Sequence, residues 1–572
     1  MVLKIIQHAR SNPYTWLTGL LLCISSYLCL VNLDYSLLYD DEAHVARVGK
    51  IFLETGTFTF WGERNLDSFG SGDVNLNSKG ESIWPPVMYV FSALGIAIFG
   101  YNEIGARSVH AFIGILALIM FLMLLRQQLP DNHRLQFLGF LFATLSVQLL
   151  LYLRQAHYSS FAVFSFLSCV YFYELYWRSK HTLWAVALTT MGLLAFLNHY
   201  SIGSATILTI ATYHALLRTA VTSKKQWLVF GGAVLLIALV GITYLSAVEA
   251  LSSIAEVRAD YAGERNIYWH WYHHLLKLWI GIKTIIAADW LCWWICIWFF
   301  MYWIFCRSKL MDRINFSGLR KLILLGMLFF VFSVLLSMQR HHDDSFINFI
   351  NLQYLPPALP LLLTMKAMFI DWLLSRRKLL GAVLMIALLS SSIGAIPFEV
   401  RNHYTGESMH GLHLISFIKE IHRPYRPDPI DEVAKYLRKN AKKDDLLFLH
   451  PIPQIDFRRN ILFYIGDHVL LCCLINRDHP IPSVRTSVRQ SLFLDPRIIP
   501  DWIVILMHRK YSVIPQRLYS QNWTSHRIPL LAHQTQSPEL NLHAFKPHTK
   551  PRFGGIIILK RKDNPANPDT WF

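Results

Sequence analysis

The feature that most constrains the fold of this chain is a series of long apolar runs separated by short polar stretches. The first run, from Tyr14 to Leu33, has about the 20 residues that a helix needs to cross a bilayer. Runs of this kind fold as membrane helices, because an unpaired backbone group is costly in hydrocarbon. Charged residues make up 16% of the chain, against roughly 25% in soluble domains. The sequence therefore predicts a polytopic α-helical membrane protein.

The topology depends on one short apolar run, 84–100, which we interpret as an interfacial segment that does not cross the membrane. With that interpretation, the Lys and Arg clusters between spans all fall on one side, as the positive-inside pattern requires. The arrangement has about eleven full spans, within a range of about 11–13 transmembrane helices. After the first span, we expect helices at about 108–125, 135–151, 158–176, 182–198, 203–217, 227–247, 284–305, 322–337, 349–368 and 379–397.

The formal net charge of +17 would suit a nucleic-acid-binding protein, but its distribution argues against that class. The cations lie in clusters between apolar runs, so we expect membrane lipids as partners and no nucleic acid. The clusters are Lys4/Arg10, Arg126/Arg134, Arg178/Lys180, Arg218/Lys224/Lys225, the run from Arg307 to Lys321, and Arg376/Arg377/Lys378. The pattern predicts an integral protein of a bacterial inner (plasma) membrane, with its N-terminus in the cytoplasm.

From about Arg401 the composition becomes that of a soluble domain. Asp428–Lys443 has the pattern of an amphipathic helix. Short apolar runs bounded by turn or charged residues are typical of strands, and they occur at Leu446–Leu449, Val469–Leu474, Trp502–Met507 and Ile556–Leu559. We therefore predict a membrane domain, 1–400, with a large first outer loop, 34–83, and an extracytoplasmic α/β domain, 401–572.

The candidate catalytic residues are the adjacent acids Asp40, Asp41 and Glu42, directly after the first span. Acids so close to hydrocarbon indicate a functional site, although the solvated edge of a loop would have the same pattern. A carboxylate there could take a proton from an acceptor hydroxyl as general base. A cation on a facing outer loop could neutralise a departing phosphate, or could simply lie at the interface. The candidate cations are Lys79, Arg154 and Arg340.

Aromatic and histidine residues accompany the outer loops that face these acids. His157 and Tyr158 follow Arg154, and His199 closes another span. A single His at a span end is usually interfacial, but the convergence of several such loops favours a shared substrate site. His270, His273 and His274 lie at helical spacing without a carboxylate among them, a pattern that also fits an interfacial aromatic belt. We predict no metal ligands and no cofactor, and leave a requirement for a divalent metal open.

Several segments resemble the family 39-type glycosyltransferases, which include the protein O-mannosyltransferases and the lipid A aminoarabinose transferase. Tyr39–Gly56, with its Asp41-Glu42 pair, amphipathic segment and Glu54-Thr55-Gly56, is similar to the family's first outer loop. Further segments match the family's motifs in order and spacing: Trp84–Tyr89, Ile98–Arg107, Arg154–Tyr158 and Gln353–Pro360. Three positions depart from the family pattern and concern phosphate binding: His44-Val45, Trp84 and Gln353.

The resemblance implies a GT-C fold and a polyprenyl-phosphate monosaccharide donor. It implies an inverting transfer to a lipid, glycan or protein acceptor at the outer face of the membrane. Asp41 would be the base and Glu42 its neighbour, with Asp40 as the competing candidate. Donor and acceptor would be bound by Lys79, Arg154, His157, Tyr158, His199 and Arg340. The alternative function is a transporter or lipid flippase with an outer domain, which predicts acids within the spans and broken helices repeated in both halves.

Overall fold

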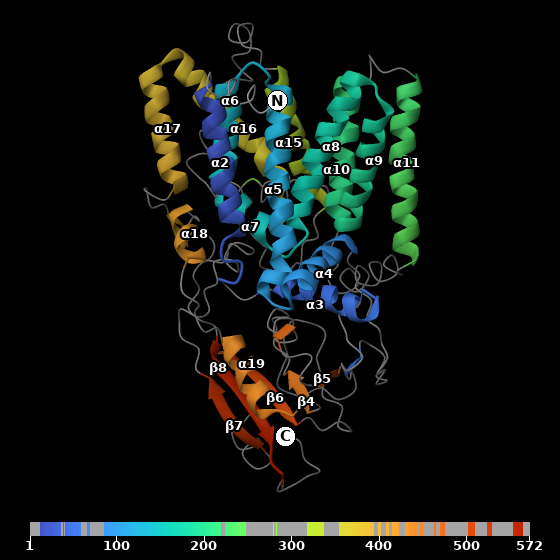
Figure 1. The fold of residues 1–572 in the computed structure, drawn as a ribbon, viewed down its shortest axis with the longest axis vertical. Coiled ribbons are helices and arrows are strands. Elements are labelled where there is room, and N and C mark those ends of the chain that lie inside the picture. Colours follow the sequence, from blue (N-terminus) through green and yellow to red (C-terminus); the bar gives the residue numbers. More distant parts are fainter. Residues whose placement is uncertain are drawn as a thin grey trace.

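The computed structural model shows a bundle of long helices and, beyond one of its ends, a small β-sheet with a covering helix (Figure 1). The structure describes residues 12–35, 38, 40–58, 66–68, 85–218, 224–247, 278, 282, 317–336, 354–393, 399–401, 408–410, 414–422, 429–442, 445–449, 463–464, 470–474, 501–508, 523–528 and 553–563.

Each predicted span overlaps one or two helices of the bundle, apart from 284–305, which lies outside the described residues. The helices are α2 (Pro13–Leu30), α5 (Glu103–Gln128), α6 (His133–Thr144), α7 (Val147–Arg154), α8 (Ser159–Ser179), α9 (Thr182–Asn198), α10 (Tyr200–Arg218), α11 (Lys224–Ala247), α15 (Ser317–Leu336), α16 (Leu359–Arg376) and α17 (Lys378–Ile393). Within the described ranges, three helices are long and apolar enough to cross a membrane: α2, α5 and the segment Gly318–Leu336. A fourth crossing is formed if the bent α6–α7 pair counts as one span.

Two of the expected spans have different boundaries or shapes in the structure. The run 135–151 is broken into α6 and α7, which meet at 65°, and the Ser146 hydroxyl accepts a hydrogen bond from Leu149 N–H at the start of α7. The run 349–368 was placed too early, because α16 begins at Leu359. Pro360 lies in its first turn, where proline is tolerated because no backbone N–H is needed there.

Three of the predicted basic clusters gather at one end of the bundle, which we call the basic end. Arg178 at the end of α8 donates to the Gln127 carbonyl at the end of α5. Arg134 at the start of α6 pairs with Asp371 near the end of α16. These contacts bring together the helix ends that carry the Arg126/Arg134, Arg178/Lys180 and Arg376–Lys378 clusters.

Two shorter helices, α3 (Asp40–Thr55) and α4 (Val87–Phe99), lie beside each other at the opposite end of the bundle, which we call the acidic end (Figure 1). A Cβ at Gly49 of α3 would lie 2.9 Å from the Ala93 nitrogen of α4, so the close approach of the two helices requires glycine there. At 13 residues, α4 is about 20 Å long. It is too short to cross a hydrocarbon layer of about 30 Å.

The sheet has six strands in the order β1-β5-β4-β6-β8-β7. The strands are β1 (Leu66–Ser68), β4 (Leu446–Leu449), β5 (Leu470–Leu474), β6 (Trp502–His508), β7 (Trp523–Ile528) and β8 (Phe553–Arg561). The four strands expected from sequence are present as β4, β5, β6 and β8, and α19 (Pro429–Asn440) matches the expected helix. β1 comes from the first outer loop and pairs in parallel with β5. A separate hairpin joins β2 (Glu399–Arg401) and β3 (Ser408–His410), and α18 (Leu414–Ile421) follows it.

Candidate active site

The three acids occupy the first turn of α3, at the acidic end of the bundle. Negative side chains are favourable there, because the N-terminus of a helix carries a partial positive charge. The helical turn directs the carboxylates of Asp41 and Glu42 into different surroundings. The exposed fraction of the Asp41 side chain is 18%, whereas that of the Glu42 side chain is 1%. Asp40 is the first residue of α3, and its side chain lies outside the described part of the structure.

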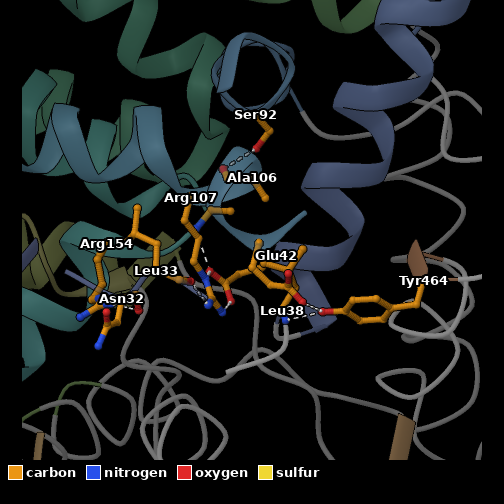
Figure 2. Close-up of polar contacts among 11 residues, drawn as sticks. Asn32, Leu33, Leu38, Glu42, Ser92, Ala106, Arg107, Arg154 and Tyr464 are labelled. Carbon is orange, nitrogen blue, oxygen red and sulfur yellow. Dashed lines mark hydrogen bonds and ion pairs between the residues drawn. The ribbon is translucent and has the colours of Figure 1, made fainter. Parts of the chain in front are cut away.

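Glu42 is held by a bidentate ion pair with Arg107 of α5 (Figure 2). Arg107 Nε donates to Glu42 Oε1 at 2.9 Å, and Nη2 donates to Oε2 at 2.7 Å. The backbone N–H of Ala156, in the turn after α7, adds a third hydrogen bond to Oε1 at 2.8 Å. A buried carboxylate with this many donors is stable as an anion and fixed in place. Its geometry suits a residue that positions its neighbour.

Arg154, a predicted phosphate-binding residue, contacts the end of α2. Its Nη1 donates to the Leu28 carbonyl, and its Nη2 donates to the Val31 and Asn32 carbonyls. Figure 2 shows Arg154 beside Asn32. The last carbonyls of a helix have no partner within the helix, and a cation there also offsets the negative end of the helix dipole. The guanidinium is 4.9 Å from the centre of the Tyr35 ring. This geometry favours a structural role, and phosphate binding by Arg154 stays a prediction.

The partly exposed Asp41 faces a buried histidine from the turn between α7 and α8. Nε2 of His157 lies 3.8 Å from Oδ2 of Asp41, and only 1% of the His157 side chain is exposed. Nδ1 of His157 is 3.2 Å from the Ser159 hydroxyl. The sequence predicted that Asp41 and His157 would share a site, and the structure brings them together.

A row of buried rings continues from His157 into the bundle. The ring of Tyr158 lies 3.7 Å from that of His157 and 4.1 Å from that of His199, centre to centre. The partly buried ring of Tyr354 lies 5.6 Å from that of His199 and 6.3 Å from that of Tyr158, centre to centre. Burial lowers the pKa of His199, at the junction of α9 and α10, to about 3, so its imidazole is neutral at physiological pH. Of the predicted site residues, Tyr158 therefore lies against His157, the group that faces Asp41, and His199 lies against Tyr158.

The remaining residues singled out from the sequence are two predicted substrate-binding cations and three histidines. Lys79 and Arg340 lie outside the described residues, as do His270, His273 and His274. Across the part of the chain that the structure describes, no group of three His, Cys, Asp or Glu side chains is placed to hold a metal ion. The sequence analysis assigned no role to Arg107. The available signal was its spacing of four residues, about one helical turn, from the charged residue Glu103.

Comparisons with known proteins address the fold. No protein-family model matches the chain. A protein of Aquifex aeolicus (strain VF5), described as uncharacterized, is 30% identical over 171 residues, which are 29% of this chain and 31% of that protein. The match thus spans less than a third of the length of that relative.

Two solved structures cover most of the chain. The crystal structure of ArnT from Cupriavidus metallidurans bound to undecaprenyl phosphate has a TM-score of 0.51 and 13% identity, covering 82% of this chain and 87% of that one. ArnT in the apo state has a TM-score of 0.50 and 15% identity, with 80% and 86% covered. At such identities the likeness shows the fold alone. The chain is an integral membrane protein with the GT-C fold of ArnT, as its sequence motifs predicted.

Proposed function

We propose that the chain is an inverting glycosyltransferase that moves a monosaccharide from a polyprenyl-phosphate donor to a lipid, glycan or protein acceptor. The observation that carries the proposal is the pair of unequal carboxylates on α3. Asp41 is partly exposed next to a buried histidine, whereas Glu42 is buried and held by Arg107. One acid can therefore meet a substrate while its neighbour is fixed. The fold shared with ArnT, a protein crystallised with undecaprenyl phosphate, supports a lipid-phosphate donor.

In the proposed reaction, Asp41 takes the proton from an acceptor hydroxyl as general base. The acceptor oxygen forms a bond to the anomeric carbon from the face opposite the phosphate, so the configuration at that carbon is inverted. The bond between that carbon and the phosphate oxygen breaks, and its electron pair leaves with the polyprenyl phosphate. The proton ends on Asp41. Fixed carboxylates suit such a step because glycosyl transfer passes through a transition state with oxocarbenium character.

A cation near Asp41 would neutralise the departing phosphate. Arg154 is a poor candidate, because its two terminal nitrogens donate to three backbone carbonyls of the α2 end. We therefore assign the phosphate to Lys79 or Arg340, the other two cations proposed from the sequence. The rings of Tyr158 and His199 would line the site next to His157.

The proposed location is the outer face of a bacterial inner membrane, with the N-terminus in the cytoplasm. The basic end of the bundle then faces the cytoplasm, in agreement with the positive-inside pattern. The acidic end with α3, and the sheet beyond it, would be extracytoplasmic. The domain 401–572 would help to bind or orient the acceptor.

The transporter alternative predicts acids inside the spans that couple to transport. Glu174 of α8 is such a buried acid, and it accepts a hydrogen bond from the Tyr213 hydroxyl of α10. Asp371 of α16 is another, and it pairs with Arg134 at the basic end. Both contacts join neighbouring helices near the basic end, a structural use of a buried acid. The enzyme therefore remains the better interpretation.

The test is transfer from a panel of radiolabelled polyprenyl-phosphate sugars in membranes that contain the wild-type chain, Asp41→Asn or Asp40→Asn. Removing a general base lowers the rate by about 10²–10⁴-fold, so we expect Asp41→Asn to lose transfer. Glu54→Gln, which changes an exposed acid at the other end of α3, is the matched control and should keep the wild-type rate.

The outcomes separate the candidates, provided that all variants insert equally and elute as one species in detergent. Loss in Asp40→Asn with retention in Asp41→Asn would move the base to Asp40. No transfer by the wild type from any donor, in membranes where ArnT is active, would overturn the proposed function and favour the transporter.

A further inference from the structure

The domain beyond the acidic end contacts the loop that carries the acids through a two-residue segment, Phe463–Tyr464. These residues lie in the chain between β4 and β5. Their side chains reach the membrane part of the protein. Tyr464 contacts Leu38, two residues before α3, and Glu103 in the first turn of α5, and Phe463 contacts Tyr101. We call this the Phe463–Tyr464 contact.

The Tyr464 hydroxyl makes two hydrogen bonds there, and Figure 2 shows Tyr464 beside Leu38. It accepts from the Leu38 backbone N–H at 3.0 Å and donates to Glu103 Oε1 at 2.8 Å. Burial, followed by the nearby Glu103 carboxylate, raises the pKa of Tyr464 well above its usual value. The hydroxyl therefore keeps its proton and remains a donor to Glu103 over the whole physiological pH range.

The ring of Phe463 packs beside this hydroxyl. It lies 4.3 Å from the ring of Tyr101, in the turn between α4 and α5, centre to centre. Phe463 belongs to a small buried cluster that also contains Leu38 and Ala43 from the region of the acids. Apolar packing thus holds Phe463 and Tyr464 in place, and the hydrogen bonds of the Tyr464 hydroxyl fix their orientation.

The two hydrogen bonds reach the acids along separate paths. Leu38 precedes the first turn of α3. The position of its backbone therefore affects where that turn, and with it Asp41, lies. Glu103 lies four residues before Arg107 on α5, and residues at that spacing share one face of a helix. Arg107 holds Glu42. One hydroxyl of the outer domain therefore joins both the backbone before the acids and the helix that fixes Glu42.

We infer that Tyr464 is a positioning residue, through which the outer domain sets the placement of the Asp41 carboxylate. The inference rests on the proposed function, because it concerns the rate of that reaction. A positioning residue differs from a merely structural one in what its loss changes. Loss of positioning lowers kcat at constant protein stability, since a small displacement of a catalytic group weakens the transition state most.

The test compares Tyr464→Phe, which keeps the ring and removes only the hydroxyl, with the wild type. We expect kcat to fall about tenfold or more, with KM for the donor changed less than about threefold. Tyr436→Phe on α19, whose ring stacks on His526 of the same domain, is the matched control and should behave as wild type. Glu103→Ala removes one of the two partners of the hydroxyl. The double variant should therefore be no slower than Tyr464→Phe, which already lacks both hydrogen bonds.

A second readout does not depend on activity. Hydrogen–deuterium exchange at the Leu38 amide should be about tenfold faster or more in Tyr464→Phe, because its hydrogen-bond acceptor is gone. The same amide should be unaffected in Tyr436→Phe.

The outcomes distinguish failure of this inference from failure of the proposed function. If the wild type transfers sugar and Tyr464→Phe shows wild-type kcat with unchanged exchange at Leu38, the inference is wrong and the function stands. A fall in stability with unchanged kcat also overturns it, because the contact is then only structural. If the wild type transfers nothing, the proposed function is wrong and the inference, which rests on it, is wrong too. Faster exchange at Leu38 in Tyr464→Phe would then show only that the hydrogen bond exists.

Discussion

Arg107 and Glu42 meet through two parallel hydrogen bonds, at 2.9 and 2.7 Å, with 1% of each side chain exposed. The guanidinium also donates to the Leu33 carbonyl at 2.7 Å, so it links α5 to the segment between α2 and α3. A pair this deeply buried is costly to break, because the remaining charge loses its partner without gaining water. The pair therefore makes the first turn of α3 a fixed element beside the partly exposed Asp41.

The first prediction concerns the stability of this pair. Arg107→Gln leaves the Glu42 carboxylate buried without its cation, and we expect the free energy of unfolding to fall by about 3–5 kcal/mol. Denaturant unfolding in detergent micelles measures the change. The double variant Arg107→Gln/Glu42→Gln has no uncompensated charge and should recover part of the loss. Equal stability of Arg107→Gln and the wild type would show that the pair contributes little.

A second prediction separates the two roles considered for Arg154. Arg154→Lys keeps the positive charge but cannot serve three carbonyls with the geometry of a guanidinium. If Arg154 caps α2, stability should fall by roughly 1–3 kcal/mol while KM for the donor changes little. Unfolding in detergent and donor titrations measure the two effects. A large rise in KM at unchanged stability would instead assign the donor phosphate to Arg154.

The third prediction is a dependence of stability on pH. His199 has a pKa of about 3 in the folded protein, below the value of about 6.5 expected in the unfolded chain. The unfolded chain therefore binds a proton first as the pH falls. His199 thus lowers stability progressively from about pH 6.5 towards pH 3, and it has no effect above about pH 7.

The comparison of melting temperatures at pH 7.5 and pH 5 in detergent tests this sign. His199→Gln cannot take up the proton, so its melting temperature should fall less between the two pH values than that of the wild type. His422, an exposed histidine after α18, supplies the control His422→Gln, which should match the wild-type pH dependence. A wild-type dependence in His199→Gln would contradict the burial of a neutral imidazole at this position.

The strongest predictions from sequence were those that depend on hydrophobic pattern alone. Each long apolar run in the described ranges became a helix, and the apolar strands β4, β5, β6 and β8 were found. The two missed strands of the six-stranded sheet, β1 and β7, lack that pattern. β1 has the sequence Leu66-Asp67-Ser68, and its pairing with β5 is set by tertiary structure. β7 exposes four consecutive residues between buried Trp523 and Ile528, so no alternation was visible.

The site was predicted only as far as charge and position along the chain allow. The sequence placed Asp41, Glu42 and His157 together, because each lies at the acidic end of a span. It could not show which carboxylate is buried, since that follows from the rotation of α3 against α5. Nor could it show that Arg154 would contact backbone carbonyls, which carry no signature in a sequence. Tyr464 lies more than three hundred residues from its partners, a separation at which a single sequence carries no signal.

The pairing of Leu66–Ser68 with Cys472–Leu474 affects the order in which the protein can assemble. During synthesis, β1 emerges about four hundred residues before the strand that it pairs with, and contacts so distant in sequence form late. Until β5 has been synthesised, β1 lacks the strand with which it pairs. Dividing the gene between the membrane helices and the soluble sheet would separate β1 from β5 and leave β5 as the edge strand of the sheet, where an open edge promotes aggregation. The pairing therefore favours synthesis of the two regions as one polypeptide.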